Sequence, residues 1–153
     1  FNTSQLSSFV GLDNLEEVGG NLEVTANLGL LGLDGLEKLE VIGGSLLLSA
    51  NLSMVQIDAL SALHTVGASV SISANPVLKS IVGLSGLTVV NDLSLNANSE
   101  LSSLEGLHNI LEVQVRALTQ LCVDHDPRAR VQSGPVSGDV DGRVAGGRGL
   151  RVV

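Results

Sequence analysis

The sequence predicts a mainly β fold, a right-handed, leucine-rich β-solenoid of about four to five coils with parallel sheets. A unit of about 24 residues recurs along the chain, and each unit carries a short stretch of alternating apolar residues. Aromatic residues make up 1% of a chain that is 44% hydrophobic. The interior is therefore aliphatic and evenly sized, which suits stacked layers because each layer presents the same shape to the next.

The repeat is clearest at one asparagine, which recurs at spacings of 24, 24 and 23 residues and always follows an alanine. We expect the alanines to turn inward where room is small, and the asparagines to form an inward ladder. Their amides can bond backbone groups at a corner, where the sheet no longer satisfies them. The alanines are Ala26, Ala50, Ala74 and Ala97, and the ladder is Asn27, Asn51, Asn75 and Asn98.

Before each asparagine the apolar residues alternate with small polar ones, as expected for a strand with one buried face. The apolar pairs are Leu22 and Val24, Leu46 and Leu48, Val70 and Ile72, and Leu93 and Leu95. Strands repeated at this period stack in register as a parallel sheet, with coils about 4.8 Å apart. We therefore expect Leu22, Leu46, Val70 and Leu93 to stack inside.

A glycine pair precedes the strand in two of the units, as Gly19-Gly20 and Gly43-Gly44. We interpret the pairs as corner residues with positive φ, which glycine adopts at the lowest cost. A phosphate-binding loop would need a following helix and a Lys-Ser/Thr pair, and the sequence lacks both.

The repeat pattern divides the chain into a solenoid over residues 1–115 and a Gly/Arg/Val-rich C-terminal segment, residues 116–153, that forms a cap or a tail. Within that segment, Asp124-His125-Asp126 could offer metal ligands, but no second cluster supports them. We interpret these three residues as a solvated acidic turn before Pro127. The sequence therefore predicts no metal site and no cofactor.

The pattern Gly-Leu-x-x-Leu-x-x-Val-Gly-Gly-x-Leu-x-Val-x-x-Asn, seen at residues 11–27, differs from the ordinary leucine-rich repeat by its Gly-Gly-x insertion. It resembles the receptor L-domain family, and within it the microbial and fungal secreted or cell-surface members. The resemblance covers about residues 6–115. It implies an extracellular or cell-surface location and a role in recognition, adhesion or wall structure. The chain lacks the disulfides and aromatic patch of the hormone-binding members.

The outward residues of the predicted strands form a flat, hydroxyl-rich surface that suits sugar hydroxyls or a protein partner. A merely solvated strand face explains the same residues, because exposed sheet faces are commonly polar. An ice-binding surface would need an unbroken ladder of hydroxyls, which Glu23 and Leu47 interrupt. The candidate ligand-binding residues are Thr25, Ser49, Ser71, Ser73, Ser94 and Asn96.

Charge and motif content exclude several function classes. Residues 1–115 hold two lysines against twelve acidic residues, a net charge of −10 that disfavours nucleic acid and anionic membranes. No apolar run approaches the roughly 20 residues of a membrane helix. No nucleophile motif is present, so we expect no enzyme. His64 and His108 are expected at equivalent, solvent-facing positions, and Asn2 and Asn51 begin possible glycosylation sequons.

These observations favour an extracellular or cell-surface recognition or adhesion module that binds glycan or protein through its strand face. The alternative is a structural surface or wall component that assembles with itself or its neighbours through the solenoid ends or the C-terminal segment.

Overall fold

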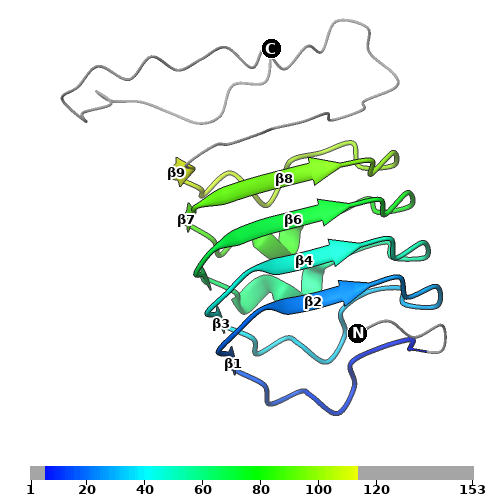
Figure 1. Ribbon diagram of the computed structural model, residues 1–153, viewed down its shortest axis with the longest axis horizontal. Coiled ribbons are helices and arrows are strands. Elements are labelled where there is room, and N and C mark those ends of the chain that lie inside the picture. The colour runs from blue at the N-terminus through cyan, green and yellow to red at the C-terminus, as the bar shows by residue number, and fades with distance from the viewer. Residues whose placement is uncertain (1–5, 114–153) are drawn as a thin grey trace, which may run out of the picture.

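The computed structural model describes residues 6–113, which form a mainly β solenoid built from parallel sheets (Figure 1). The largest sheet has four strands in the order β2 (Leu22–Thr25), β4 (Leu46–Ser49), β6 (Ser69–Ser73) and β8 (Asp92–Asn96). A second sheet joins β1 (Glu17–Val18), β3 (Val41–Ile42) and β5 (Thr65–Val66), and β7 (Val89–Val90) pairs with β9 (Glu112–Val113). Two 3-10 helices, η1 (Asp58–Ala62) and η2 (Val82–Leu84), lie on another side of the coils.

The four-stranded sheet keeps one register throughout, in which Leu22 pairs with Leu46, Leu46 with Val70, and Val70 with Leu93. The predicted parallel β-solenoid is confirmed, but its coil number is smaller than the expected four to five. Four strands in register enclose three full turns, from Asn27 to Asn98. Counting repeat units in the sequence therefore overstated the number of closed turns by one to two.

The core follows the predicted alternation. Leu22 and Leu93, in the two outer strands of the four-stranded sheet, are 5% exposed, while Leu46 and Val70 between them are fully buried. These four side chains stack inside, as expected. Beside them lie leucines from the opposite wall, such as Leu36, Leu60 and Leu84, so each layer repeats the same aliphatic set.

The asparagines at the end of each strand are buried and link successive coils. The backbone N–H groups of Asn27, Asn51 and Asn75 donate to the side-chain oxygen of the next asparagine, at 3.0 to 3.1 Å. Each later asparagine also donates its Nδ2 to a carbonyl of the preceding coil, which is Val24 for Asn51, Leu48 for Asn75 and Ile72 for Asn98. The side chains thus satisfy backbone groups that turn away from the sheet.

The glycine pairs have a different role from the predicted one. None of Gly19, Gly20, Gly43 and Gly44 has positive φ. Instead, a Cβ on Gly43 would lie 2.5 Å from the carbonyl oxygen of Gly19, and a Cβ on Gly67 would lie 2.1 Å from that of Gly43. Glycine is needed at this corner because the backbones of successive coils touch there, and the expectation of positive φ was wrong.

The alanines before the ladder, and not those glycines, hold the left-handed backbone conformation. Ala26, Ala50, Ala74 and Ala97 have φ between 53° and 56°. Their side chains are half-buried, or exposed at Ala97, so the expectation that they turn inward was also wrong. The left-handed residue turns the chain at the end of each strand, and the asparagine that follows it is buried.

Candidate functional site

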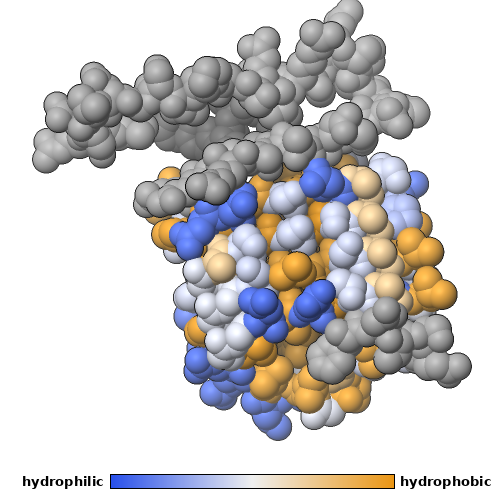
Figure 2. Space-filling model, viewed as in Figure 1, coloured by the Kyte–Doolittle hydropathy of each residue, from blue (hydrophilic) through white to orange (hydrophobic). Residues whose placement is uncertain are grey.

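The outward side of the four-stranded sheet, here called the strand face, carries three columns of residues. One column is Thr25, Ser49, Ser73 and Asn96, the next is Glu23, Leu47, Ser71 and Ser94, and the third is Asn21, Ser45, Ser69 and Asp92. Because pairing is in register, the structure brings all six predicted ligand-binding residues onto this one surface. Figure 2 views this side and shows pale, weakly polar side chains in columns across the strands.

Hydroxyl groups of neighbouring coils bond to each other along two of the columns. Ser73 Oγ donates to Ser49 Oγ at 3.1 Å, and Ser69 Oγ donates to Ser45 Oγ at 3.0 Å. A hydroxyl has one proton and two lone pairs, so each serine pair keeps one proton and at least two lone pairs for a ligand, although Ser45 Oγ also accepts the Ser69 N–H at 3.3 Å. The pairs fix the spacing of these groups without using up their hydrogen-bonding capacity.

The C-terminal end of the columns differs from the rest, because asparagine replaces the hydroxyl residue. Asn96 Nδ2 donates to Ser94 Oγ at 2.7 Å, which joins the first two columns. The Asn96 Oδ1 is buried and has no hydrogen-bond partner among residues 6–113. This oxygen is therefore an acceptor that still requires a donor.

Three residues break the uniformity of the strand face. Glu23 is exposed and Asp92 is half-buried, at opposite ends of the sheet, and the half-buried Leu47 lies between serine-bearing positions. The strand face is thus weakly acidic and carries one apolar side chain, that of Leu47.

Sequence reasoning missed an apolar border along one edge of the strand face. The left-handed alanines directly follow the Thr25–Asn96 column, and a beige column of hydrophobic colour is visible in Figure 2 beside the pale ones. Beyond the ladder, Leu28 is 51% exposed and Leu52 is 50% exposed. No sequence signal marked this border, because alanine rarely adopts the left-handed conformation that holds it near the surface.

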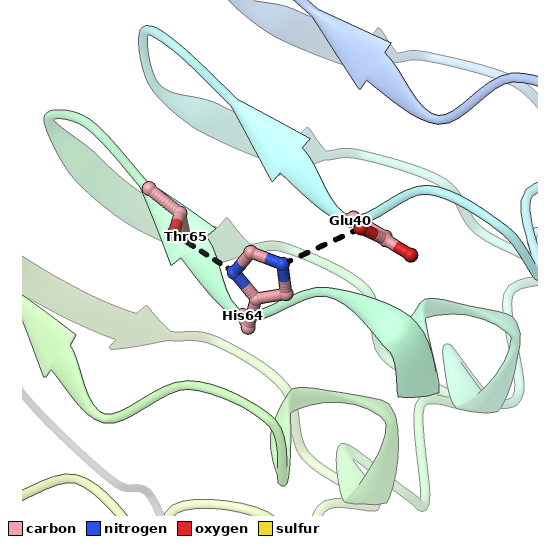
Figure 3. A network of polar contacts seen from close by, with 3 residues as sticks. All are labelled: Glu40, His64 and Thr65. Carbon is pink, nitrogen blue, oxygen red and sulfur yellow. Dashed lines mark hydrogen bonds and ion pairs between the residues drawn. The ribbon is translucent and has the colours of Figure 1, made fainter.

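The described residues contain no group of three or more His, Cys, Asp and Glu side chains that could hold a metal ion. His64 lies in a small polar network (Figure 3), where its Nδ1 is 3.0 Å from Thr65 Oγ1 and its Nε2 is 3.6 Å from a carboxylate oxygen of Glu40. Both side chains of the His64–Glu40 pair are more than half exposed. An exposed pair of this kind contributes little to stability.

The two histidines are not equivalent, contrary to expectation. Leu63 and Ile110 occupy the same position in their coils. The backbone N–H of each donates to the carbonyl oxygen of the leucine three residues earlier, Leu60 and Leu107 respectively. His64 follows Leu63 directly, whereas His108 comes two residues before Ile110. Both histidines are exposed, but they belong to different columns of the repeat.

The sequon asparagine Asn51 is fully buried, and its Nδ2 donates to the carbonyl of Val24 at 2.9 Å. A glycan attached to that nitrogen has no room in this fold, and we therefore predict that the sequon at Asn51 is not used. Asn2, Asp124-His125-Asp126 and the predicted cap or tail over 116–153 lie outside the described residues.

Within residues 6–113, no helix is long and apolar enough to cross a membrane. Comparison with known proteins finds no matching family model, no matching curated protein and no matching solved structure.

Proposed function

We propose that this chain is a non-catalytic recognition or adhesion module of the extracellular space or cell surface, which binds a glycan through its strand face. The observation that supports this most is the in-register set of hydroxyl columns, with Ser49–Ser73 and Ser45–Ser69 bonded side by side. The same surface could contact a protein, but fixed hydroxyls at a regular spacing match a polymer of sugars better.

The spacing favours a linear glycan as the partner. Coils of a parallel stack repeat about every 4.8 Å, so an extended polymer can contact the same group in several coils at once. Individually weak contacts then add up to useful avidity. Glu23 and Asp92 disfavour a polyanionic glycan, so the preferred partner is uncharged.

The finer assignment of the fold is part of the same proposal. The Gly-Gly-x insertion and the recurring asparagine support an L-domain-like solenoid, and parallel β-crossovers are right-handed in about 98% of cases. The proposed location and the link to secreted or cell-wall proteins rest on the resemblance to that family.

A glycan array probed with the chain of residues 1–153 tests the proposal. We expect retention on linear uncharged glycans, and loss of retention in the double variant Ser49→Lys/Ser73→Lys, which adds bulk and charge in one column without touching the core. Ser61→Lys, on the exposed part of η1, is the matched control and should bind as the unchanged chain does. Absence of binding to every glycan would reject the proposal, and binding that survives the double change would reject the site.

A further inference from the structure

The apolar border of the strand face begins with alanines that directly follow its hydroxyl column. Ala50 and Ala74 are half-buried and come immediately after Ser49 and Ser73. The backbone N–H of Ala50 donates to the carbonyl oxygen of Ser73 at 3.0 Å, so the alanine is held by the same coil-to-coil bonding as the serines. One methyl group therefore lies beside one hydroxyl group in each of these coils, at the coil spacing of about 4.8 Å.

Two exposed leucines widen this border. Leu28 is 51% exposed and Leu52 is 50% exposed, and they occupy the same position in neighbouring coils, one residue after the buried asparagine. Ser53 Oγ donates to the carbonyl oxygen of Leu28 at 2.6 Å, which links the two turns. Figure 2 shows strongly hydrophobic side chains beyond the beige column. A ligand on this edge of the strand face thus meets polar groups on one side and aliphatic groups on the other.

The hydroxyl column ends at Asn96, which offers a second observation about the ligand. Its Nδ2 donates to Ser94, but its buried Oδ1 has no donor among residues 6–113. A buried acceptor without a donor is uncommon in a folded protein and calls for a partner. A ligand hydroxyl that reaches this end of the column would supply the missing donor, once the half-buried Asn96 side chain turns toward it.

A sugar ring in which every substituent is equatorial has the same division of polarity as this edge. Its hydroxyl groups lie around the rim, whereas its two faces carry only C–H groups. A ring that lies over the alanine methyls can turn its rim toward the serine hydroxyls, so that it buries apolar surface while it gains hydrogen bonds. An axial hydroxyl would instead be pressed against a methyl group without a hydrogen-bond partner.

The linkage between the sugars follows from the coil spacing. A β-1,4 linkage between such rings gives an extended ribbon, which advances per sugar by a distance close to the coil spacing of about 4.8 Å. An α-1,4 linkage curves the polymer, so that successive rings leave the columns. On the basis of the proposed glycan-binding function, we propose that the strand face and its apolar border bind an extended, uncharged, β-1,4-linked glycan of all-equatorial sugars, with one sugar per coil.

Calorimetric titration of the chain of residues 1–153 with defined oligosaccharides tests this ligand class. Cello- and chito-oligosaccharides supply β-1,4-linked all-equatorial rings, without and with an N-acetyl group. We expect the affinity for one or both series to rise at least about tenfold from the disaccharide to the tetrasaccharide, and to change little beyond it, because the sheet has four strands. The α-1,4-linked malto series, and the manno series with its axial hydroxyl, should bind at least about tenfold more weakly.

Leu52→Ser tests the border without touching the hydroxyl columns. Loss of this exposed side chain should weaken tetrasaccharide binding by about threefold to tenfold. Val82→Ser is the matched control, because Val82 is a 41% exposed aliphatic residue of η2, on another side of the coils, and its loss should leave binding unchanged. Thermal melting establishes that both variants are folded.

The outcomes separate this inference from the function on which it rests. Absence of binding to every glycan would reject both. Equal or tighter binding of the malto series would overturn the inference and leave glycan binding in place. So would affinity that stops rising at the disaccharide, or binding that Ser49→Lys/Ser73→Lys abolishes and Leu52→Ser leaves unchanged.

Discussion

The side-chain oxygen of Asn51 accepts a hydrogen bond from the backbone N–H of Asn27, which lies 24 residues earlier and one coil away. The same amide donates from Nδ2 to the carbonyl of Val24. One side chain therefore satisfies a buried donor and a buried acceptor of the preceding coil at the point where the strand has ended. The coils are joined at this corner by side chains, and along the strands by the sheet.

Replacing Asn51 by alanine should lower the free energy of unfolding by about 1–3 kcal/mol, because it removes two buried hydrogen bonds, one from the N–H of Asn27 and one to the carbonyl of Val24. Asn75→Ala should have a similar effect. Chemical denaturation measures the change. Asn14→Ala is the control, since Asn14 is exposed and bonds only the exposed Lys38 among the described contacts, and its effect should stay within about 0.5 kcal/mol. Equal effects at Asn51 and Asn14 would contradict the structural role of the ladder.

The corner glycines give a paired prediction. Gly67→Ala should destabilise by about 1–3 kcal/mol, because its Cβ would lie 2.1 Å from the carbonyl oxygen of Gly43 and the two coils would have to separate. Gly19→Ala meets no atoms and should leave stability unchanged or raise it by up to about 1 kcal/mol, through the lower entropy of the unfolded chain. The midpoints of thermal unfolding compare the two variants. If Gly19→Ala proved as harmful as Gly67→Ala, backbone contact would not be the reason for glycine.

The left-handed alanines predict that substitution by glycine does not lower stability there, in contrast to its usual effect. Ala74 has φ of 55°, a conformation that costs an L-residue about 1–2 kcal/mol, so Ala74→Gly should leave stability unchanged or increase it by up to about 1 kcal/mol. Ala68 does not have positive φ, and Ala68→Gly should lower stability by about 0.5–1 kcal/mol. Urea titrations of both variants decide the matter, and a loss of stability in Ala74→Gly equal to that in Ala68→Gly would contradict the role assigned to the left-handed backbone.

Burial of Asn51 predicts that the folded protein carries no glycan there. After expression in a host that glycosylates secreted proteins, the mass of the folded fraction should be the same with or without Ser53→Ala, which removes the sequon. The Asn2 sequon remains intact in both proteins and serves as the internal control. A glycopeptide containing modified Asn51, recovered from folded material, would contradict the observed packing.

The parallel stack, the inward apolar pairs and the outward hydroxyl columns could be predicted from the sequence, because period-two alternation and a fixed repeat length dictate them. Leu22 and Leu46 must share a side if their strands pair in register, and Ser49 and Ser73 must then share the other. These are consequences of strand geometry alone.

The corner could not be predicted from such periodicity. Glycine suits both a positive φ and a close backbone contact, and only the distance between coils shows that the second reason applies at Gly43 and Gly67. Alanine gave no signal of a left-handed conformation, which it rarely adopts. The buried Asn96 Oδ1, which has no hydrogen-bond partner among the described residues, and the exposed Leu52 likewise depend on the path of the turn after the strand, which a repeat pattern does not specify.

The corner between β7 and β8 is one residue shorter than its counterparts, yet Val70 still pairs with Leu93, and Asn91 Nδ2 donates to the carbonyl of Gly67 across the gap. A corner one residue shorter is therefore compatible with the same strand pairing, and the Asn91 side chain still bonds the preceding coil there. Removal of one residue inside a strand would turn every following side chain of that strand to the opposite side. Natural variation in the length of genes that encode such coils should accordingly accumulate at the corners, and whole units should be gained or lost between one asparagine codon and the next.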